Sequence, residues 1–316
     1  MSELSEFLHY GTIALGISMN AIGVGIGQGL TGKAALTAIN MQPSAQSEIT
    51  KTAILGITLI ETSAVMGALI SFLVLRVTHQ NSFSGLAELG IAFAICLPGI
   101  VIGIVSSWPA QSSCMAIARQ PFLAQRISRF MAITQALIQA PVLFGLLIAL
   151  FISTQASMAN SLFDSLRLIG AGLCIGLGSI GPAIGLALFS RTACYGQGIN
   201  PKAGNTLLSF TFISAPLIET PIIFALIVSL TLLFAPGSQH ETIDGIALLA
   251  AGLCTGLGTF GAGIGSGLIA SAACNQIALN PDSHSVIART SMFGQAFIET
   301  GSIYAILISL VLIFFR

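Results

Sequence analysis

The chain alternates long apolar stretches with short polar segments. Eight of the stretches reach the roughly 20 residues that a transmembrane helix requires. They cover residues 10–36, 50–76, 85–114, 128–154, 161–190, 206–235, 243–273 and 287–315. The pattern therefore predicts an all-α membrane protein with eight transmembrane helices.

Every second connection is a polar turn that contains proline. The prolines of these turns are spaced by 78, 80 and 80 residues, at Pro43, Pro121, Pro201 and Pro281. A fixed spacing of this kind indicates an internal repeat. We predict four tandem helical hairpins, with boundaries at 1–80, 81–157, 158–237 and 238–316.

A single polar residue recurs in the middle of the second helix of each hairpin. Eighteen residues after the turn prolines stand Glu61, Gln139, Glu219 and Glu299. A charge at bilayer mid-depth costs at least about 2.5 kcal/mol, so such a residue usually has a partner or a task. Three acids in one register favour ion carriage over structural hydrogen bonds between helices. Gln139 cannot ionise, and we expect its hairpin to carry no ion.

Basic residues gather beside the proline turns. Eight of them flank the turns, namely Lys33, Lys51, Arg119, Arg126, Arg129, Arg191, Lys202 and Arg289. Only Arg76, Arg167 and Arg316 lie toward the other side. The positive-inside rule predicts that the proline turns are cytoplasmic and that both termini lie on the opposite side.

Composition supports an integral, multi-pass membrane protein. The chain is 54% hydrophobic and 7% charged, whereas soluble domains are about 25% charged. The formal net charge is zero, which gives no indication of a nucleic-acid partner. The six cysteines partly follow the repeat, and small buried residues explain them better than disulfides or metal ligands.

The first helix of a hairpin carries small residues at every second position. The run is Gly23, Gly25, Gly27 and Gly29 in the first copy, and it recurs from Gly261 to Gly267. At 100° per residue, Gly23 and Gly27 share one face and Gly25 and Gly29 lie nearly opposite. Two small faces favour a helix packed between like neighbours, as in an inner ring, over ordinary packing in a compact bundle.

The glycine-rich helix, the Gln-Pro or Asn-Pro turn and the second helix with a central Glu resemble the c subunit, or proteolipid, of rotary ATP synthases and ATPases. The likeness is closest to the F-type form, although F-type c subunits usually have one hairpin. It implies a rotor-ring subunit that is not itself an enzyme, needs no cofactor and carries H⁺ or Na⁺ on Glu61, Glu219 and Glu299. The implied partners are further copies of the chain in a ring, alone or with other c subunits, a stator a subunit that supplies an arginine, the central stalk and the lipid bilayer.

The resemblance also assigns the proline turns to the contact with the central stalk. The residues concerned are Gln42, Pro43, Arg119, Gln120, Pro121, Asn200, Pro201, Asn280 and Pro281. The family places its ion sites between neighbouring hairpins, so ligands from adjacent copies can mix.

The resemblance further implies a cation shell around Glu61. Sodium-binding members have a Gln 33 residues before the Glu and a hydroxyl residue directly after it, and Gln28 and Thr62 stand at these positions. The carbonyl of Leu59 is a candidate to complete the shell. A set of oxygens suits a hard cation, so Na⁺ at Gln28, Glu61 and Thr62 is one expectation.

The other hairpins match this pattern less fully. The position of Gln28 is taken by Ser106, Leu186 and Ser266, while Thr220 and Thr300 keep the hydroxyl. Tyr304 matches a family tyrosine that holds the carboxylate, and Gln295 could donate a hydrogen bond to Glu299. Leu186 favours a protonated acid at Glu219. The sequence leaves both H⁺ and Na⁺ open.

A stand-alone secondary transporter with eight helices is the alternative function. Transporters of that kind are commonly built from inverted repeats and broken helices. The repeats in this chain all run in the same direction, which favours the rotor subunit.

Overall fold

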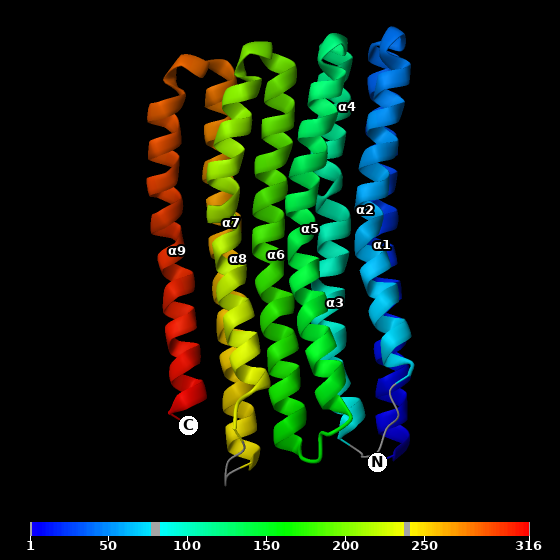
Figure 1. Cartoon of the computed structure of the whole chain (residues 1–316), viewed down its shortest axis with the longest axis vertical. Helices are drawn as coiled ribbons and strands as arrows, with labels where there is room; N and C mark the ends of the chain where they lie inside the picture. Colours follow the sequence, from blue (N-terminus) through cyan, green and yellow to red (C-terminus); the bar gives the residue numbers. More distant parts are fainter. Residues whose placement is uncertain (1, 77–82, 237–240, 316) are drawn as a thin grey trace.

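The computed structural model describes residues 2–76, 83–236 and 241–315, and within them the chain folds into long helices that run side by side (Figure 1). The helices are α1 (Ser2–Met41), α2 (Gln46–Val74), α3 (Ser84–Val105), α4 (Ser107–Arg119), α5 (Ala124–Ala156), α6 (Leu162–Ile199), α7 (Gly204–Leu233), α8 (Glu241–Leu279) and α9 (His284–Phe314). With α3 and α4 counted as one span, eight spans in these ranges are long and apolar enough to cross a membrane. This confirms the prediction of an all-α membrane protein. The expected hairpin boundaries at 80/81 and 237/238 lie outside the described residues, as does Arg316.

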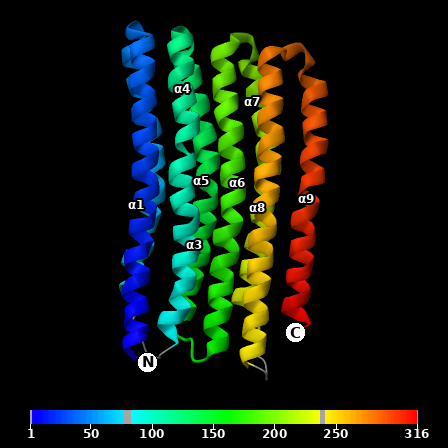
Figure 2. The same ribbon diagram turned by 180° about the vertical axis from the view of Figure 1, so that it is seen from behind.

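The helices form two rows (Figures 1 and 2). In the inner row, α1 packs against α3 and α4, these pack against α6, and α6 packs against α8. In the outer row, α2, α5, α7 and α9 follow one another in the same order. The four hairpins therefore stand side by side in chain order, with hairpin 1 and hairpin 4 at the two ends.

The proline turns share one end of the molecule, and the N- and C-termini share the other (Figure 1). Each turn is a single 3₁₀ turn that begins with proline: Pro43–Ala45, Pro121–Leu123, Pro201–Ala203 and Pro281–Ser283. Proline suits the first position of a helical turn, because its missing N–H is not needed there and its φ is already set. The side of the membrane on which these turns lie stays a prediction.

Glycines bring the helices of the inner row into backbone contact. A Cβ on Gly103 would lie 2.6 Å from the carbonyl carbon of Gly23, and a Cβ on Gly27 would collide with the carbonyl oxygen of Gly103. On the other face of α1, a Cβ on Gly25 or Gly29 would meet no atom within 4 Å. One small-residue face of α1 is thus packed within the chain, and the opposite face is uncovered.

The inner span of hairpin 2 is interrupted between α3 and α4. Pro109 has no N–H, so the carbonyl of Val105 lacks the usual helical donor four residues on. The regular helical pattern lapses for one residue at Ser106, whose backbone stays in the α-helical region (φ −61°, ψ −19°) and whose carbonyl oxygen accepts a hydrogen bond from Gln135 Nε2 at 2.8 Å. This irregular turn at Ser106 therefore directs a backbone carbonyl to the outer row, one helical turn from Gln139.

Candidate ion-carrying stations

The mid-membrane residue of each outer helix marks what we call a station. Stations 1 to 4 are centred on Glu61 in α2, Gln139 in α5, Glu219 in α7 and Glu299 in α9. The side chains at stations 2 and 3 are partly buried, whereas Glu61, at the uncovered end of the row, is exposed. The environment of a station therefore depends on whether another hairpin precedes it.

Station 2 shows which elements build a station. Gln139 Nε2 donates to the Leu59 carbonyl oxygen at 3.1 Å and to Ser106 Oγ at 3.2 Å. Ser106 belongs to the inner span of the same hairpin, and Leu59 belongs to the outer helix of the preceding hairpin. Station 2 thus lies between two hairpins and takes groups from both.

The Gln139 side chain satisfies both of these oxygens without an ion. An amide in the opposite orientation would set its own oxygen against the Leu59 carbonyl, so the donor geometry fixes which way the group points. The amide nitrogen therefore occupies both oxygens, while Gln139 Oε1 is buried and has no hydrogen-bond partner among the described residues.

Leu59 and Thr62 lie at station 2 instead of completing a shell around Glu61. The Thr62 hydroxyl donates to the Leu59 carbonyl at 2.7 Å, beside the Gln139 amide. The residues on either side of Glu61 therefore face hairpin 2. The expected single-hairpin shell of Gln28, Glu61 and Thr62 is not what this geometry assembles.

Stations 3 and 4 contain carboxyl oxygens without hydrogen-bond partners. In the part of the chain that the structure describes, Glu219 Oε1 and Glu299 Oε1 are buried and accept no hydrogen bond, and Ser266 Oγ is likewise unpaired. The Thr220 hydroxyl donates to the Pro216 carbonyl of its own helix at 3.0 Å. An ionised carboxyl whose oxygen accepts no hydrogen bond carries a high free-energy cost at this depth in the membrane. Binding a proton or a cation would neutralise the carboxyl and remove that cost.

The inner helix contributes differently to stations 3 and 4. Leu186 of α6 is fully buried and stands where hairpin 2 has Ser106, so it brings no side-chain oxygen to Glu219. Ser266 of α8 is also fully buried at the corresponding position and can supply an oxygen at station 4. Station 3 is therefore the least polar of the three acidic stations.

Two further expectations for Glu299 are not met. Tyr304 is 67% exposed, and among the described residues it makes no hydrogen bond with Glu299. The Gln295 amide donates to Ser214 Oγ and Ser291 Oγ, each at 3.0 Å, so it is not directed at the carboxyl. Gln295 joins α7 and α9 one turn away from the station.

The two ends of the row each display part of a station. Gln28 and Glu61 stand at the open end of hairpin 1, and both are accessible. At the open end of hairpin 4, the exposed Thr300 donates its hydroxyl to the Phe297 carbonyl at 2.7 Å. Thr62 and Leu59 form the same hydroxyl-to-carbonyl hydrogen bond at station 2. The exposed side of hairpin 4 therefore presents the hydroxyl and carbonyl groups that hairpin 1 presents to hairpin 2.

The turn residues expected to meet the stalk partly tie neighbouring hairpins together. Asn200 Nδ2 donates to the Ala278 carbonyl at 3.1 Å, and the Arg119 guanidinium lies 4.5 Å from the centre of the Tyr195 ring. The other turn residues, Gln42, Pro43, Gln120, Pro121, Pro201, Asn280 and Pro281, lie at the same end of the molecule and are exposed or partly exposed. This end therefore presents a row of four turns.

The fold and the stations define a class of membrane protein built from tandem helical hairpins with acids in register at mid-depth. The family model of the ATP synthase C subunit matches residues 12–74, 169–232 and 249–312, together more than half of the chain. The chain therefore belongs to the ATP synthase C subunit family. The matched ranges leave out hairpin 2, the copy with the irregular turn at Ser106 and with Gln139 in place of an acid.

Individual relatives each correspond to about one hairpin. The ATP synthase c subunit of Mesomycoplasma hyopneumoniae (strain 7448) is 43% identical over 77 residues, which are 24% of this chain and 75% of the relative. That of Dehalococcoides mccartyi (strain BAV1) is 45% identical over 71 residues, 22% of this chain and 93% of the relative. That of Sulfurimonas denitrificans is 34% identical over 84 residues, 27% and 81% of the two chains. The resemblance to c subunits is confirmed.

Proposed function

We propose that this chain is an ion-translocating subunit of the rotor ring of a rotary ATP synthase or ATPase, and that it carries H⁺ or Na⁺ on Glu61, Glu219 and Glu299. The observation that carries the proposal is the contrast between stations. Gln139 donates its amide to oxygens of two hairpins and cannot ionise, whereas Glu219 and Glu299 are ionisable; all three side chains keep one buried oxygen with no partner among the described residues. The two glutamate positions are suited to a removable proton or cation.

The proposed mechanism uses neutralisation of each acid. A carboxyl that has bound a proton or Na⁺ is neutral and can face lipid at low cost, whereas the ionised form cannot. Each acid would load at one aqueous access path, turn through the lipid and unload at a second path. A stator arginine would displace the ion and separate the paths, while the cytoplasmic proline turns would meet the central stalk.

Station 1 would be completed by a second copy of the chain. Hairpin 1 supplies Gln28 and Glu61, and hairpin 4 of the preceding copy would supply the Phe297 carbonyl and the Thr300 hydroxyl, as hairpin 1 supplies Leu59 and Thr62 to station 2. Four oxygens of this kind suit a hard cation such as Na⁺.

The uncovered glycine faces support this junction between copies. Gly25 and Gly29 are open on α1, and Gly261 of α8 also has no atom within 4 Å of an added Cβ. Inside the chain, inner helices approach through glycines at these same repeat positions. Joining unlike ends of identical subunits generates a ring if the rotation closes.

ATP-driven ion uptake into vesicles that contain the purified complex tests the proposal. Glu61→Gln, Glu219→Gln and Glu299→Gln should each reduce uptake by about a third or more, because each variant loses one of the three proposed carriers in every chain. Gln139→Leu, the matched control, removes no carrier and should leave uptake at the wild-type rate. Uptake at the wild-type rate by any of the three Glu→Gln variants would contradict ion carriage at that residue. A pH-sensitive dye and radioactive sodium distinguish H⁺ from Na⁺.

A further inference from the structure

The uncovered face of the inner row is an apolar band. On α6, the partly exposed side chains along this face are Leu173, Leu177, Ile180, Ile184 and Leu188. On α3 and α4 they are Phe93, Leu97, Ile100, Ile104 and Trp108. Their spacing of three or four residues keeps them on one side of each helix. This band has the surface chemistry of a protein face that contacts acyl chains.

Both helices turn polar at the same level, toward the proline turns. Leu188 is followed on the same face by Arg191, and Trp108 is followed by Gln111, the residue 80 positions before Arg191. Arg191 is five residues beyond Leu186, which places it about 7.5 Å from the level of the stations at 1.5 Å per residue. The band thus ends abruptly in a charged and amide-bearing rim.

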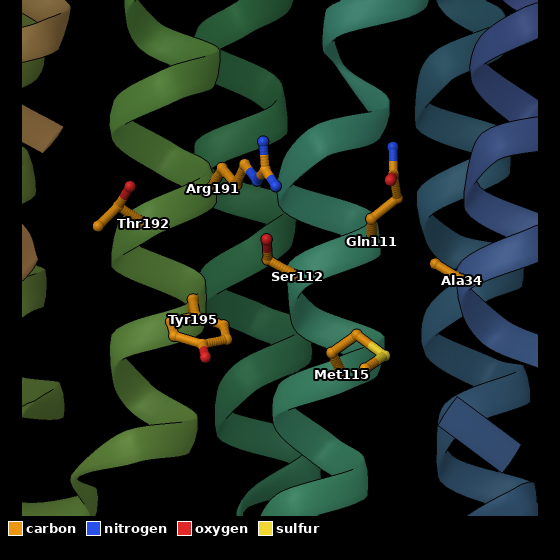
Figure 3. Close-up of a pocket in the computed structure, with 7 residues that line it drawn as sticks. All are labelled: Ala34, Gln111, Ser112, Met115, Arg191, Thr192 and Tyr195. Atoms are coloured by element: carbon orange, nitrogen blue, oxygen red, sulfur yellow. The ribbon is translucent and has the colours of Figure 1, made fainter. Parts of the chain in front are cut away.

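A groove of about 400 Å³ lies at this rim, between α4 and α6 with α1 at its side (Figure 3). Its lining residues are Ala34, Gln111, Ser112, Met115, Arg191, Thr192 and Tyr195. The Arg191 side chain extends from α6 across the groove toward Gln111 and Ser112 (Figure 3). A cation, an amide and a hydroxyl therefore converge at one place.

The positive charge of Arg191 is not compensated within the described part of the chain. No carboxylate there forms an ion pair with it. The acids of the inner row, from Glu3 to Asp244, all lie near the end that holds the termini. The nearest charges along the row have the same sign, because Lys33 holds the equivalent position on α1 and Arg119 lies over Tyr195. An arginine at this depth favours an anionic partner.

We propose that this groove binds the phosphate of an anionic phospholipid whose acyl chains lie on the apolar band. The planar guanidinium of Arg191 can hold two phosphate oxygens, and the Ser112 hydroxyl and a free hydrogen of the Gln111 amide can donate to the head group. Gln111 uses its other amide hydrogen on Ser107 Oγ at 2.9 Å. The apolar band favours a lipid over a soluble phosphate, and the uncompensated charge favours an anionic lipid over a neutral one.

The single tryptophan of the chain is a built-in reporter for this site. Trp108 lies on the band one turn from Gln111, so a brominated acyl chain bound there would quench its fluorescence. The full chain is reconstituted in phosphatidylcholine vesicles with 20% dibrominated phosphatidylglycerol, or with 20% dibrominated phosphatidylcholine. We expect quenching by the anionic lipid to exceed quenching by the neutral lipid at least twofold.

Variants and a competitor distinguish the sources of the phosphate. Arg191→Gln should bring the quenching ratio to about one, Arg191→Lys should keep part of the preference, and Arg289→Gln, which removes an exposed charge on α9, should keep all of it. An unchanged quenching ratio in Arg191→Gln would overturn the proposal. Loss of the preference for the anionic lipid in 10 mM inorganic phosphate at constant ionic strength would also overturn it, because the groove would then bind free phosphate. If Arg191→Gln does not insert, the wild type still decides, because equal quenching by the two lipids refutes the site.

Discussion

Restoring an acid at station 2 should create a fourth ion-carrying position. In Gln139→Glu, the amide that donates at 3.1 Å to the Leu59 carbonyl and at 3.2 Å to Ser106 Oγ is replaced by a carboxyl. A protonated carboxyl donates one hydrogen bond, so the variant loses one interhelical bond, worth about 0.6 kcal/mol in a membrane protein. An ionised carboxyl would face the Leu59 carbonyl oxygen without a donor. The new acid should therefore hold a proton or a cation, as we propose for stations 3 and 4.

The assay is intact-mass measurement after exhaustive reaction with dicyclohexylcarbodiimide, which modifies protonated carboxyls in apolar surroundings. The wild type should accept at most three additions, and Gln139→Glu should accept four. Gln139→Leu, in which a side chain of similar size without a carboxyl replaces the amide, should accept at most three additions. The unfolding free energy of Gln139→Glu in detergent should fall by less than about 1 kcal/mol, because only one such bond is lost.

A maximum of three additions in Gln139→Glu, with the fold intact, would refute the reasoning. It would mean that the irregular turn at Ser106 withholds station 2 from ions whatever the residue at 139. Four additions in the wild type would refute it differently, since an acid outside the three stations would then behave as an ion carrier.

Three other changes test separate parts of the account. Gly27→Leu should disturb the fold of a single chain, because its side chain collides with the Gly103 carbonyl. Gly29→Leu should leave the chain folded but prevent two copies from joining, because Gly29 lies on the uncovered face of α1. Native mass spectrometry distinguishes these two results. Leu186→Gln should raise the protection of Glu219 by Na⁺ against dicyclohexylcarbodiimide, because it adds an oxygen to the least polar station, and unaltered protection would count against that role. In a ring of three chains, about 9 ions rather than about 12 should cross per turn, and a measured ion-to-ATP ratio that matches the full hairpin number would contradict a silent station 2.

The spans, the turns and the station register could be predicted because the residues that recur in each repeat have strong physical requirements. Pro43 and its three equivalents fix the turns, and a lone acid in an apolar helix fixes each carrier position. The irregular turn at Ser106 could not be predicted from Pro109, because Pro182 lies inside α6 and Pro216 inside α7 and both helices continue without interruption. Hydrophobicity does not register a proline that leaves a span apolar.

The assignment of ligands to stations could not be predicted from the spacing alone. In a repeat of about 80 residues, a group in the same hairpin and its equivalent in the neighbouring one have the same sequence pattern. Only the structure shows that Leu59 and Thr62 face Gln139 rather than Glu61. The role of Gln135 in joining α5 to α2 and to Ser106 was missed for a similar reason, because its acceptors, Gly56 and Ser106, are backbone carbonyls.

Peptide-resolved labelling of the wild-type chain tests the central proposal most directly. After reaction with dicyclohexylcarbodiimide and digestion, mass spectrometry reports modification at each station separately. We expect adducts at Glu61, Glu219 and Glu299, none on the peptide that contains Gln139, and protection of the acids by whichever ion the ring transports. A station acid that stays unmodified while the other two react to completion would contradict the claim that three stations carry ions.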